Sequence, residues 1–143
     1  VKAMLMAPTS NNRKGWEFLV VEDEDKLKKL SQSREKGSQF LDGAPLAIVI
    51  ATEEDPYDVW IEDTSIAATI AQLTIHSLGL SSCWIQVRNR NRDENTSTGD
   101  CIKELLDIPA KAEIECMIAI GYPDEEKAPH DEETLRYDKV RYI

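Results

Sequence analysis

The chain has 143 residues, of which 41% are hydrophobic and 31% are charged, a composition typical of one globular domain. Its 27 Asp and Glu outnumber its 17 Lys and Arg and leave a formal net charge of −10. Such a surface repels nucleic acid and anionic membranes, so we expect neither as a partner. No apolar run approaches the ~18 residues of a membrane span, and nothing in the sequence resembles a signal peptide. The three scattered Cys, without a CxxC motif, indicate small core residues in a reducing cytoplasm.

The first third of the chain predicts a helix end, two strands and a helix. Residues 1–7 read as the last turns of a helix, and a loop of Pro, Thr, Ser and Asn follows at 8–12. Aromatic and β-branched residues predict a buried strand over 16–23. Leucines at helical spacing among charges predict a surface helix over 23–35. A continuous apolar run predicts a central strand over 45–51, covered on both faces.

The middle of the chain carries the clearest helical periodicity. Apolar residues at helical spacing over 61–78 predict a long, mostly buried helix of about five turns. Glu62 and Asp63 lie in its first turn, where they complement the helix dipole, and Gly79 is placed as a C-terminal cap. The next apolar segment, 81–87, predicts a third strand.

The last third predicts a short helix, a strand and an extended arm. Residues 88–99 are a polar loop, and 100–109 predict an amphipathic helix that stops before a proline. A fourth strand is expected over 112–121. The polar tail 123–143 predicts an arm with a short strand at 139–143. The arm is too polar to fold alone, so it should lie on a surface, such as that of another subunit.

Familiar catalytic signatures are missing from the sequence. It contains no Walker loop, no GxGxxG, no HExxH and no GxSxG motif. Glu62 and Asp63 are helix N-terminal charges first and acid–base candidates second. His76 is expected to cap its helix or to lie in the core rather than to bind a metal. Loops rich in small hydrogen-bonding side chains remain, at 8–12 and 79–88.

Four of these segments, in this order and spacing, resemble the nitroreductase family of FMN-dependent oxidoreductases. The resemblance continues through the segments near the C-terminus and covers nearly all of residues 1–143, as a single domain. The segments are "PTSNN", "APLAIVI", "IEDTSIAATIAQLTIHSLGL" and "SCWIQV", followed by "IPAKAEIECMIAIGYPDEEKAP" and "LRYDKVRY".

The resemblance implies an α+β fold with a mixed or antiparallel central sheet flanked by helices. It also implies a homodimer whose subunits exchange domain-swapped arms, with 123–143 as the dimer arm. Two FMN molecules would lie in the interface, each touching both chains. NADH or NADPH would give hydride to the flavin, which would reduce a nitro group, quinone or similar small acceptor by a ping-pong mechanism. The flavin supplies the chemistry, so no catalytic side chain is expected.

The family's FMN contacts carry over to two segments of this chain and to one lysine beyond them. An amide can donate and accept along the polar edge of the flavin ring, which suits Asn12. A main-chain N–H of Gln86 or Val87 would be aimed at flavin N5 and would stabilise charge on the reduced flavin. The cofactor-binding residues implied are Pro8, Thr9, Ser10, Asn12, Trp84, Ile85, Gln86, Val87 and Lys127. A turn with an Asx cap remains the alternative for the first segment, and an ordinary buried strand for the second.

Several features depart from the family pattern. The family's Arg-Arg-Ser-x-Arg run, which grips the phosphate, does not occur here, so we expect residues upstream of Val1 to supply it. Lys127 is the first candidate cation within the chain. The further candidates for the phosphate or an anionic substrate are Arg136, Arg13, Lys14, Arg88 and Arg90.

Two local features bear on the pocket and its use. Gly15 replaces a common proline and is expected to give backbone freedom beside the ring. The segment 52–60 is short and acidic, which predicts an open pocket. Two other functions stay open: an enzyme of the same fold with another acceptor, and a flavin-free dimeric binding or scaffold protein.

Overall fold

A four-stranded antiparallel sheet forms the centre of the protein. The structure is a computed structural model that describes residues 1–53 and 56–143, so part of the predicted open segment 52–60 lies outside the described residues. The α+β class and an antiparallel central sheet are confirmed. The strand order is β1-β2-β4-β3, with β1 at Trp16–Val21, β2 at Leu46–Thr52, β3 at Ser81–Gln86 and β4 at Ile114–Gly121.

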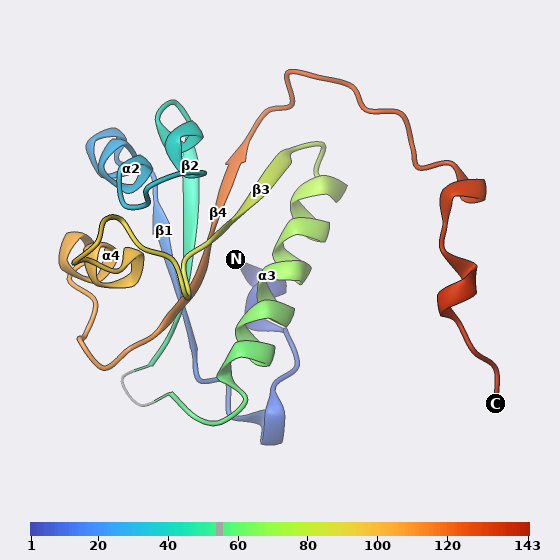
Figure 1. Cartoon of the computed structure of the whole chain (residues 1–143), viewed down its shortest axis with the longest axis horizontal. Coiled ribbons are helices and arrows are strands. Elements are labelled where there is room, and N and C mark those ends of the chain that lie inside the picture. Colours follow the sequence, from blue (N-terminus) through green and yellow to red (C-terminus); the bar gives the residue numbers. More distant parts are fainter. Residues whose placement is uncertain (54–55) are drawn as a thin grey trace.

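Helices cover both faces of the sheet (Figure 1). The short α1 (Lys2–Leu5) and the long α3 (Trp60–Ser77) lie on one face, and α2 (Glu24–Ser31) and α4 (Thr98–Leu106) on the other. The prediction that α2 reaches residue 35 is wrong. The Ser31 hydroxyl donates to the carbonyl of Lys28, and such side-chain bonds compete with helix continuation.

The strand β2 is buried on both faces, as predicted. Ala47, Val49 and Ala51 pack toward α2 and α4, whereas Ile48 and Ile50 pack toward α3. The period-two alternation of a strand divides the same apolar run between two cores.

The helix α3 is buried on one side only. Its three buried alanines, Ala67, Ala68 and Ala71, allow the close packing on the sheet that the sequence indicates. Ile66 and Leu73 point outward, with 40% and 67% of their surface exposed. The prediction of a mostly buried helix is therefore wrong for this chain alone, since an apolar strip on its outer side is uncovered.

The C-terminal arm, 123–143, borders the body at its first residues and then stands clear of it (Figure 1). Its residues are exposed throughout, and its regular structure consists of two short 3₁₀ turns, Glu132–Thr134 and Tyr137–Lys139. The predicted strand at 139–143 does not form. A strand needs a neighbouring edge to satisfy its backbone groups, and no described strand runs beside this segment.

Candidate functional site

The loop before β1 has an unusual backbone. Asn11, Asn12 and Lys14 all have positive φ angles, of 51°, 55° and 54°. Asn tolerates the left-handed region, but Lys rarely adopts it, and such conformations cluster at functional sites. The backbone N–H of Lys14 donates to the Thr9 hydroxyl oxygen at 3.0 Å, which helps to hold the turn. The loop is therefore a fixed structure with its Asn12 side chain exposed.

A buried carboxylate anchors this loop to the body. Asp63, in the first turn of α3, accepts from the backbone N–H of Ser10 through both oxygens, at 3.0 and 3.1 Å. Its second partner is the Tyr57 hydroxyl, which donates to the same carboxylate. Because this bond uses the Ser10 N–H, the groups left to face a ligand are the Ser10 hydroxyl and the Asn12 amide. The sequence indicated Asp63 as a helix-dipole charge and as an acid–base candidate, but not as an anchor for this loop.

Tyr57 is held in its protonated form by this arrangement. Burial, followed by the hydrogen bond and the charge of Asp63, raises the pKa of Tyr57 to about 12. Because the pKa is higher in the folded chain than in the unfolded one, protonated Tyr57 favours the folded state below pH ~10, the ordinary Tyr value. The contribution is then lost between that pH and about 12. Arg13 lies over the Tyr57 ring, 4.9 Å from its centroid.

Gly15 is needed for space rather than for backbone freedom, so that expectation is wrong. Its φ is not positive, but a Cβ there would lie 2.6 Å from Cε1 of Tyr57. We expect Gly15→Ala to displace the ring and to lower the free energy of unfolding by about 1–3 kcal/mol, as overpacking does. Urea denaturation measures this loss in the free energy of unfolding. Gly99→Ala is the control, since its Cβ would meet nothing closer than 3.8 Å, and an equal loss there would contradict the steric explanation.

The end of β3 has one main-chain edge with no neighbouring strand among the described residues. Val87 donates its N–H to the Glu115 carbonyl of β4 at 3.1 Å. Successive N–H groups along a strand point in opposite directions, so the Gln86 N–H faces away from β4. Because β3 is an outer strand, that side is the open edge. Arg34 lies on the same side, with Nη1 3.4 Å from the Gln86 carbonyl oxygen. Of the two predicted donors, the geometry favours Gln86.

The other predicted strand residues divide by face. Ile85 and Val87 are buried in the core beneath α2 and α4. Trp84 is half-buried on the α3 side, where its indole N–H donates to Oε1 of Gln86 at 2.9 Å. Trp84 and Gln86 are therefore the two side chains of this segment that reach the surface near the open edge.

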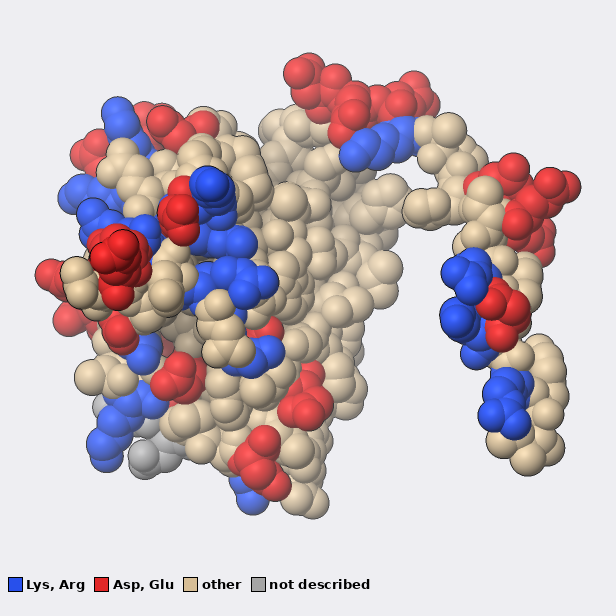
Figure 2. Space-filling view, viewed as in Figure 1, with Lys and Arg blue, Asp and Glu red and all other residues tan. Residues whose placement is uncertain are grey.

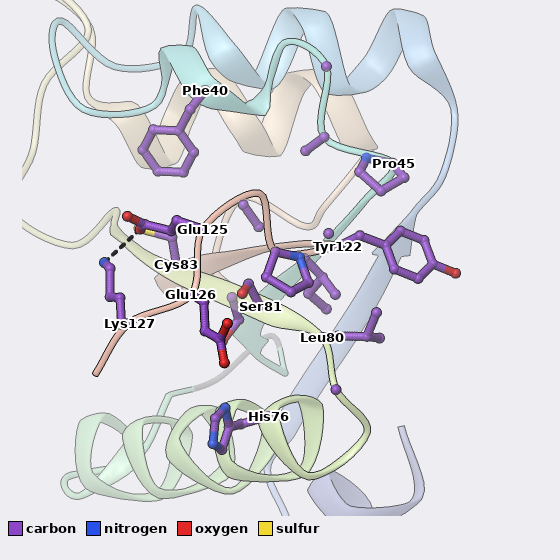
Figure 3. Close-up of a pocket in the computed structure, with 18 of the residues that line it drawn as sticks. Phe40, Pro45, His76, Leu80, Ser81, Cys83, Tyr122, Glu125, Glu126 and Lys127 are labelled. Atoms are coloured by element: carbon purple, nitrogen blue, oxygen red, sulfur yellow. Dashed lines mark ion pairs between the residues drawn. The ribbon is translucent and has the colours of Figure 1, made fainter. Parts of the chain in front are cut away.

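A large open cavity lies at the other end of β3 (Figure 3). It has a volume of about 1280 Å³, and the segments around Phe40, the end of α3, Cys83 and the start of the arm line it. Lys127 borders it, with Nζ 2.8 Å from Oε1 of Glu125, and this hydrogen bond raises the pKa of Lys127. His76 also lines the cavity and is exposed, so the expectation of a core histidine is wrong, although it does lie in the last turn of α3.

Lys127 lies near the open edge of β3, but the "PTSNN" loop does not. Lys127 and Cys83 border the same cavity, and Cys83 precedes Gln86 by about 10 Å along the strand. The loop 8–12 is instead bound at Asp63, in the first turn of α3. The predicted residues thus form two groups within one chain, one at the start of α3 and one along β3.

The other candidate cations have partners or lie far from these groups. Arg88 is paired with the buried Glu115, Arg13 approaches Asp58 at 3.9 Å, and Arg136 binds Asp138 on the arm. Figure 2 shows basic and acidic side chains interspersed on the body and along the arm. The basic run 88–92 follows the Gln86 edge directly.

The cysteines do not form one class. Cys116 is buried in β4, and burial raises the pKa of its thiol, so it remains protonated. Cys83 is exposed on the outer strand and Cys101 is half-buried, so the prediction of three core residues is wrong for them. All three thiols are free.

In the described part of the chain, no group of three or more potential ligands could hold a metal ion, and no helix is long and apolar enough to cross a membrane.

The four-stranded antiparallel sheet with helices on both faces defines an α+β fold that is known from many solved structures. The chain aligns over 99% of its length, at a TM-score of 0.95 and 52% identity, with 82% of an FMN-dependent nitroreductase from Clostridium difficile. A protein of Archaeoglobus fulgidus, provisionally named NADH dehydrogenase/NAD(P)H nitroreductase, is 34% identical over 131 residues, covering 89% of this chain and 72% of that protein. A similarly named Methanothermobacter thermautotrophicus protein is 30% identical, with 90% and 66% covered.

The family model agrees with these relatives. Residues 28–122 match the model of the nitroreductase family. The chain therefore belongs to the nitroreductase family, as the sequence motifs indicated.

Proposed function

We propose that this protein is an FMN-dependent oxidoreductase that uses NADH or NADPH to reduce nitro compounds, quinones or related small acceptors. The proposal includes a ping-pong cycle in a cytoplasmic homodimer. The observation that carries it is the open main-chain edge at Gln86, in a chain that is 52% identical to an FMN-dependent nitroreductase. FMN, when bound, supplies the hydride chemistry, and the protein binds and orients it.

The residues present fit a flavin. The Gln86 N–H on the open edge would point at the ring, and Trp84 would bound the same surface. Lys127 borders the cavity beside Cys83, which precedes Gln86 by three residues on β3, and the phosphate end of the cofactor could reach it there. The Ser10 hydroxyl and the Asn12 amide would provide the remaining polar contacts. Pro8 and Thr9 would shape the loop, and Ile85 and Val87 would act through their main chain.

The separation of the two groups favours a site shared by two subunits. Among the described residues, the loop 8–12 is hydrogen-bonded to Asp63 of α3 and not to Trp84, Gln86 or Val87. A second copy could place its 8–12 loop against the Gln86 edge of the first.

The uncovered apolar surfaces support the same assembly. Ile66 and Leu73 of α3 are exposed, and the arm carries Leu135, Tyr137 and Tyr142 with at least 48% of their surface accessible. An arm with this much exposed apolar area requires a partner surface. We propose that residues 123–143 bind the second subunit.

Flavin uptake tests the proposed function directly. The purified protein mixed with FMN should bind about one flavin per chain, seen by its absorbance after gel filtration. NADH or NADPH should bleach the bound flavin under anaerobic conditions, and a nitroaromatic or a quinone should restore its absorbance. A dimer that takes up no FMN would instead support a flavin-free binding or scaffold protein. A flavin that is bleached but not restored by either acceptor would indicate the same fold with another acceptor.

Two neighbouring asparagines provide a matched test of the loop. Asn12→Ala should weaken FMN binding about tenfold by removing the amide from the ring edge, which corresponds to about 1.4 kcal/mol. Asn11→Ala is the control, because Asn11 is also exposed and left-handed, with φ of 51°. Both changes strain the turn similarly, so both should lower stability by the same amount. Fluorescence titration gives the affinities, and equal losses of affinity would favour the plain turn.

A further inference from the structure

A buried acidic residue lies behind the open edge of β3. Glu115 occurs in β4 at an irregularity in the sheet, because Ile50 pairs with Cys116 whereas Ala51 pairs with Ile114. Glu115 is thus the extra residue of a β-bulge, a feature that often redirects a side chain next to a functional site. Its main-chain carbonyl accepts from the N–H groups of both Val87 and Arg88, at 3.1 and 3.2 Å.

The Glu115 side chain binds the two residues that flank Val87. Its Oε2 accepts from Nε of Arg88 at 2.7 Å, and its Oε1 accepts from Nε2 of Gln86 at 3.1 Å. Glu115 is buried, whereas 34% of the Arg88 side chain is exposed. A buried carboxylate is costly unless it is paired and hydrogen-bonded, so this arrangement constrains all three residues.

The network orients the Gln86 side chain completely. Its Nε2 donates to Glu115 while its Oε1 accepts from the Trp84 indole, so neither end of the amide can turn over. At the open edge of the strand, Arg34 donates to the Gln86 carbonyl oxygen. The main chain of Gln86 is therefore held from two directions, and its outward N–H has a defined position.

We infer that Glu115 is a positioning residue that fixes the Gln86 edge and neutralises Arg88 beside the flavin. The inference rests on the proposed function, since it concerns the charge that a flavin at this edge would meet. With Glu115 ionised, the pair with Arg88 contributes little net field. Without it, the Arg88 cation stands uncompensated and favours the reduced, more negatively charged form of the flavin.

Redox-dependent affinity tests this inference. Glu115→Gln keeps the shape and can still accept hydrogen bonds, so the fold should survive. We expect the affinity for reduced FMN, relative to the affinity for oxidised FMN, to rise about tenfold. This change is measured as a more positive midpoint potential of the bound flavin. The double variant Glu115→Gln with Arg88→Gln should return the ratio to within about twofold of the wild type. A loss of packing alone would not be reversed by a second substitution.

A matched control and a flavin-free measurement complete the test. Glu113→Gln changes an acidic residue of the same segment whose side chain is 48% exposed, 3.9 Å from Lys103, and should leave the ratio unchanged. In the protein without FMN, the Arg88 Nε–H should exchange with water at least tenfold faster in Glu115→Gln than in the wild type, by NMR.

The outcomes separate this inference from the proposed function. Wild-type protein that binds no FMN overturns both, although the Arg88 exchange still reports the network. If the wild-type protein binds FMN and the midpoint potential in Glu115→Gln is unchanged, only the inference is overturned. A shift that persists in the double variant also overturns it, because the charge on Arg88 would then not be its cause.

Discussion

Asp63→Asn should lower the free energy of unfolding by about 2 kcal/mol and weaken FMN binding at least tenfold. The substitution preserves volume but replaces charge-assisted hydrogen bonds to Ser10 and Tyr57 with weaker neutral ones. It also places the NH₂ group of the new amide against either the Ser10 N–H or the Tyr57 hydroxyl, both of which are donors. Because Asp63 is buried, water cannot replace the lost acceptor. The loop 8–12 should then lose the anchor that holds its left-handed residues.

Three measurements check this prediction. Urea denaturation gives the stability, fluorescence titration gives the FMN affinity, and ultraviolet absorbance against pH follows Tyr57. The pKa of Tyr57, raised to about 12 by burial first and Asp63 second, should fall toward its ordinary value in the variant. Asp58→Asn is the control, because Asp58 is exposed and its ion pair with Arg13 is long, at 3.9 Å. This substitution should therefore change the free energy of unfolding by less than ~0.5 kcal/mol. If both variants behave alike, Asp63 does not anchor the loop.

Deleting Asp131–Ile143 should convert a dimer to a monomer at micromolar concentration and release most of the flavin. The described arm residues hydrogen-bond to one another, as in Arg136 with Asp138 and Tyr137 with Glu132, rather than to the body. The body should therefore keep its secondary structure and unfold at nearly the same urea concentration when measured as a monomer. In the proposed dimer, the lost apolar area would be part of the contact with the second subunit.

Light scattering after gel filtration gives the mass, and absorbance gives the flavin content. A control variant, Arg136→Gln with Asp138→Asn, removes the exposed ion pair of the arm and keeps its apolar residues. It should remain a dimer, since exposed pairs contribute little. A truncated protein that stays dimeric and yellow would show that the arm is not needed for either property.

The sequence alone was enough to locate most elements and the family. The runs that became β1, β2, β3 and β4 were each recognisable to within about two residues at most ends, and so was the long helix α3. These patterns are local, because the burial of alternate residues or of every third and fourth residue is written directly into the chain. The order of the motifs "PTSNN" and "SCWIQV" then identified the family.

Glu115 carries a signal that is visible in the sequence. Glu115 interrupts an otherwise apolar run, and a charged residue in a buried strand signals a specific partner. Tyr57 and Arg34 offered no comparable signal, because each gains its place from contacts with residues far along the chain, Asp63 and Gln86.

The sequence by itself determined the element order, the polar loops and the family of this protein. Only the tertiary structure decided that Asp63 anchors Ser10, that Val87 bonds to β4 while Gln86 faces the open edge, and that Arg88 is neutralised. The reason is physical. Periodicity reports how a residue is buried within its own element, whereas a hydrogen-bond partner is fixed by strand order and register, which bring distant segments together.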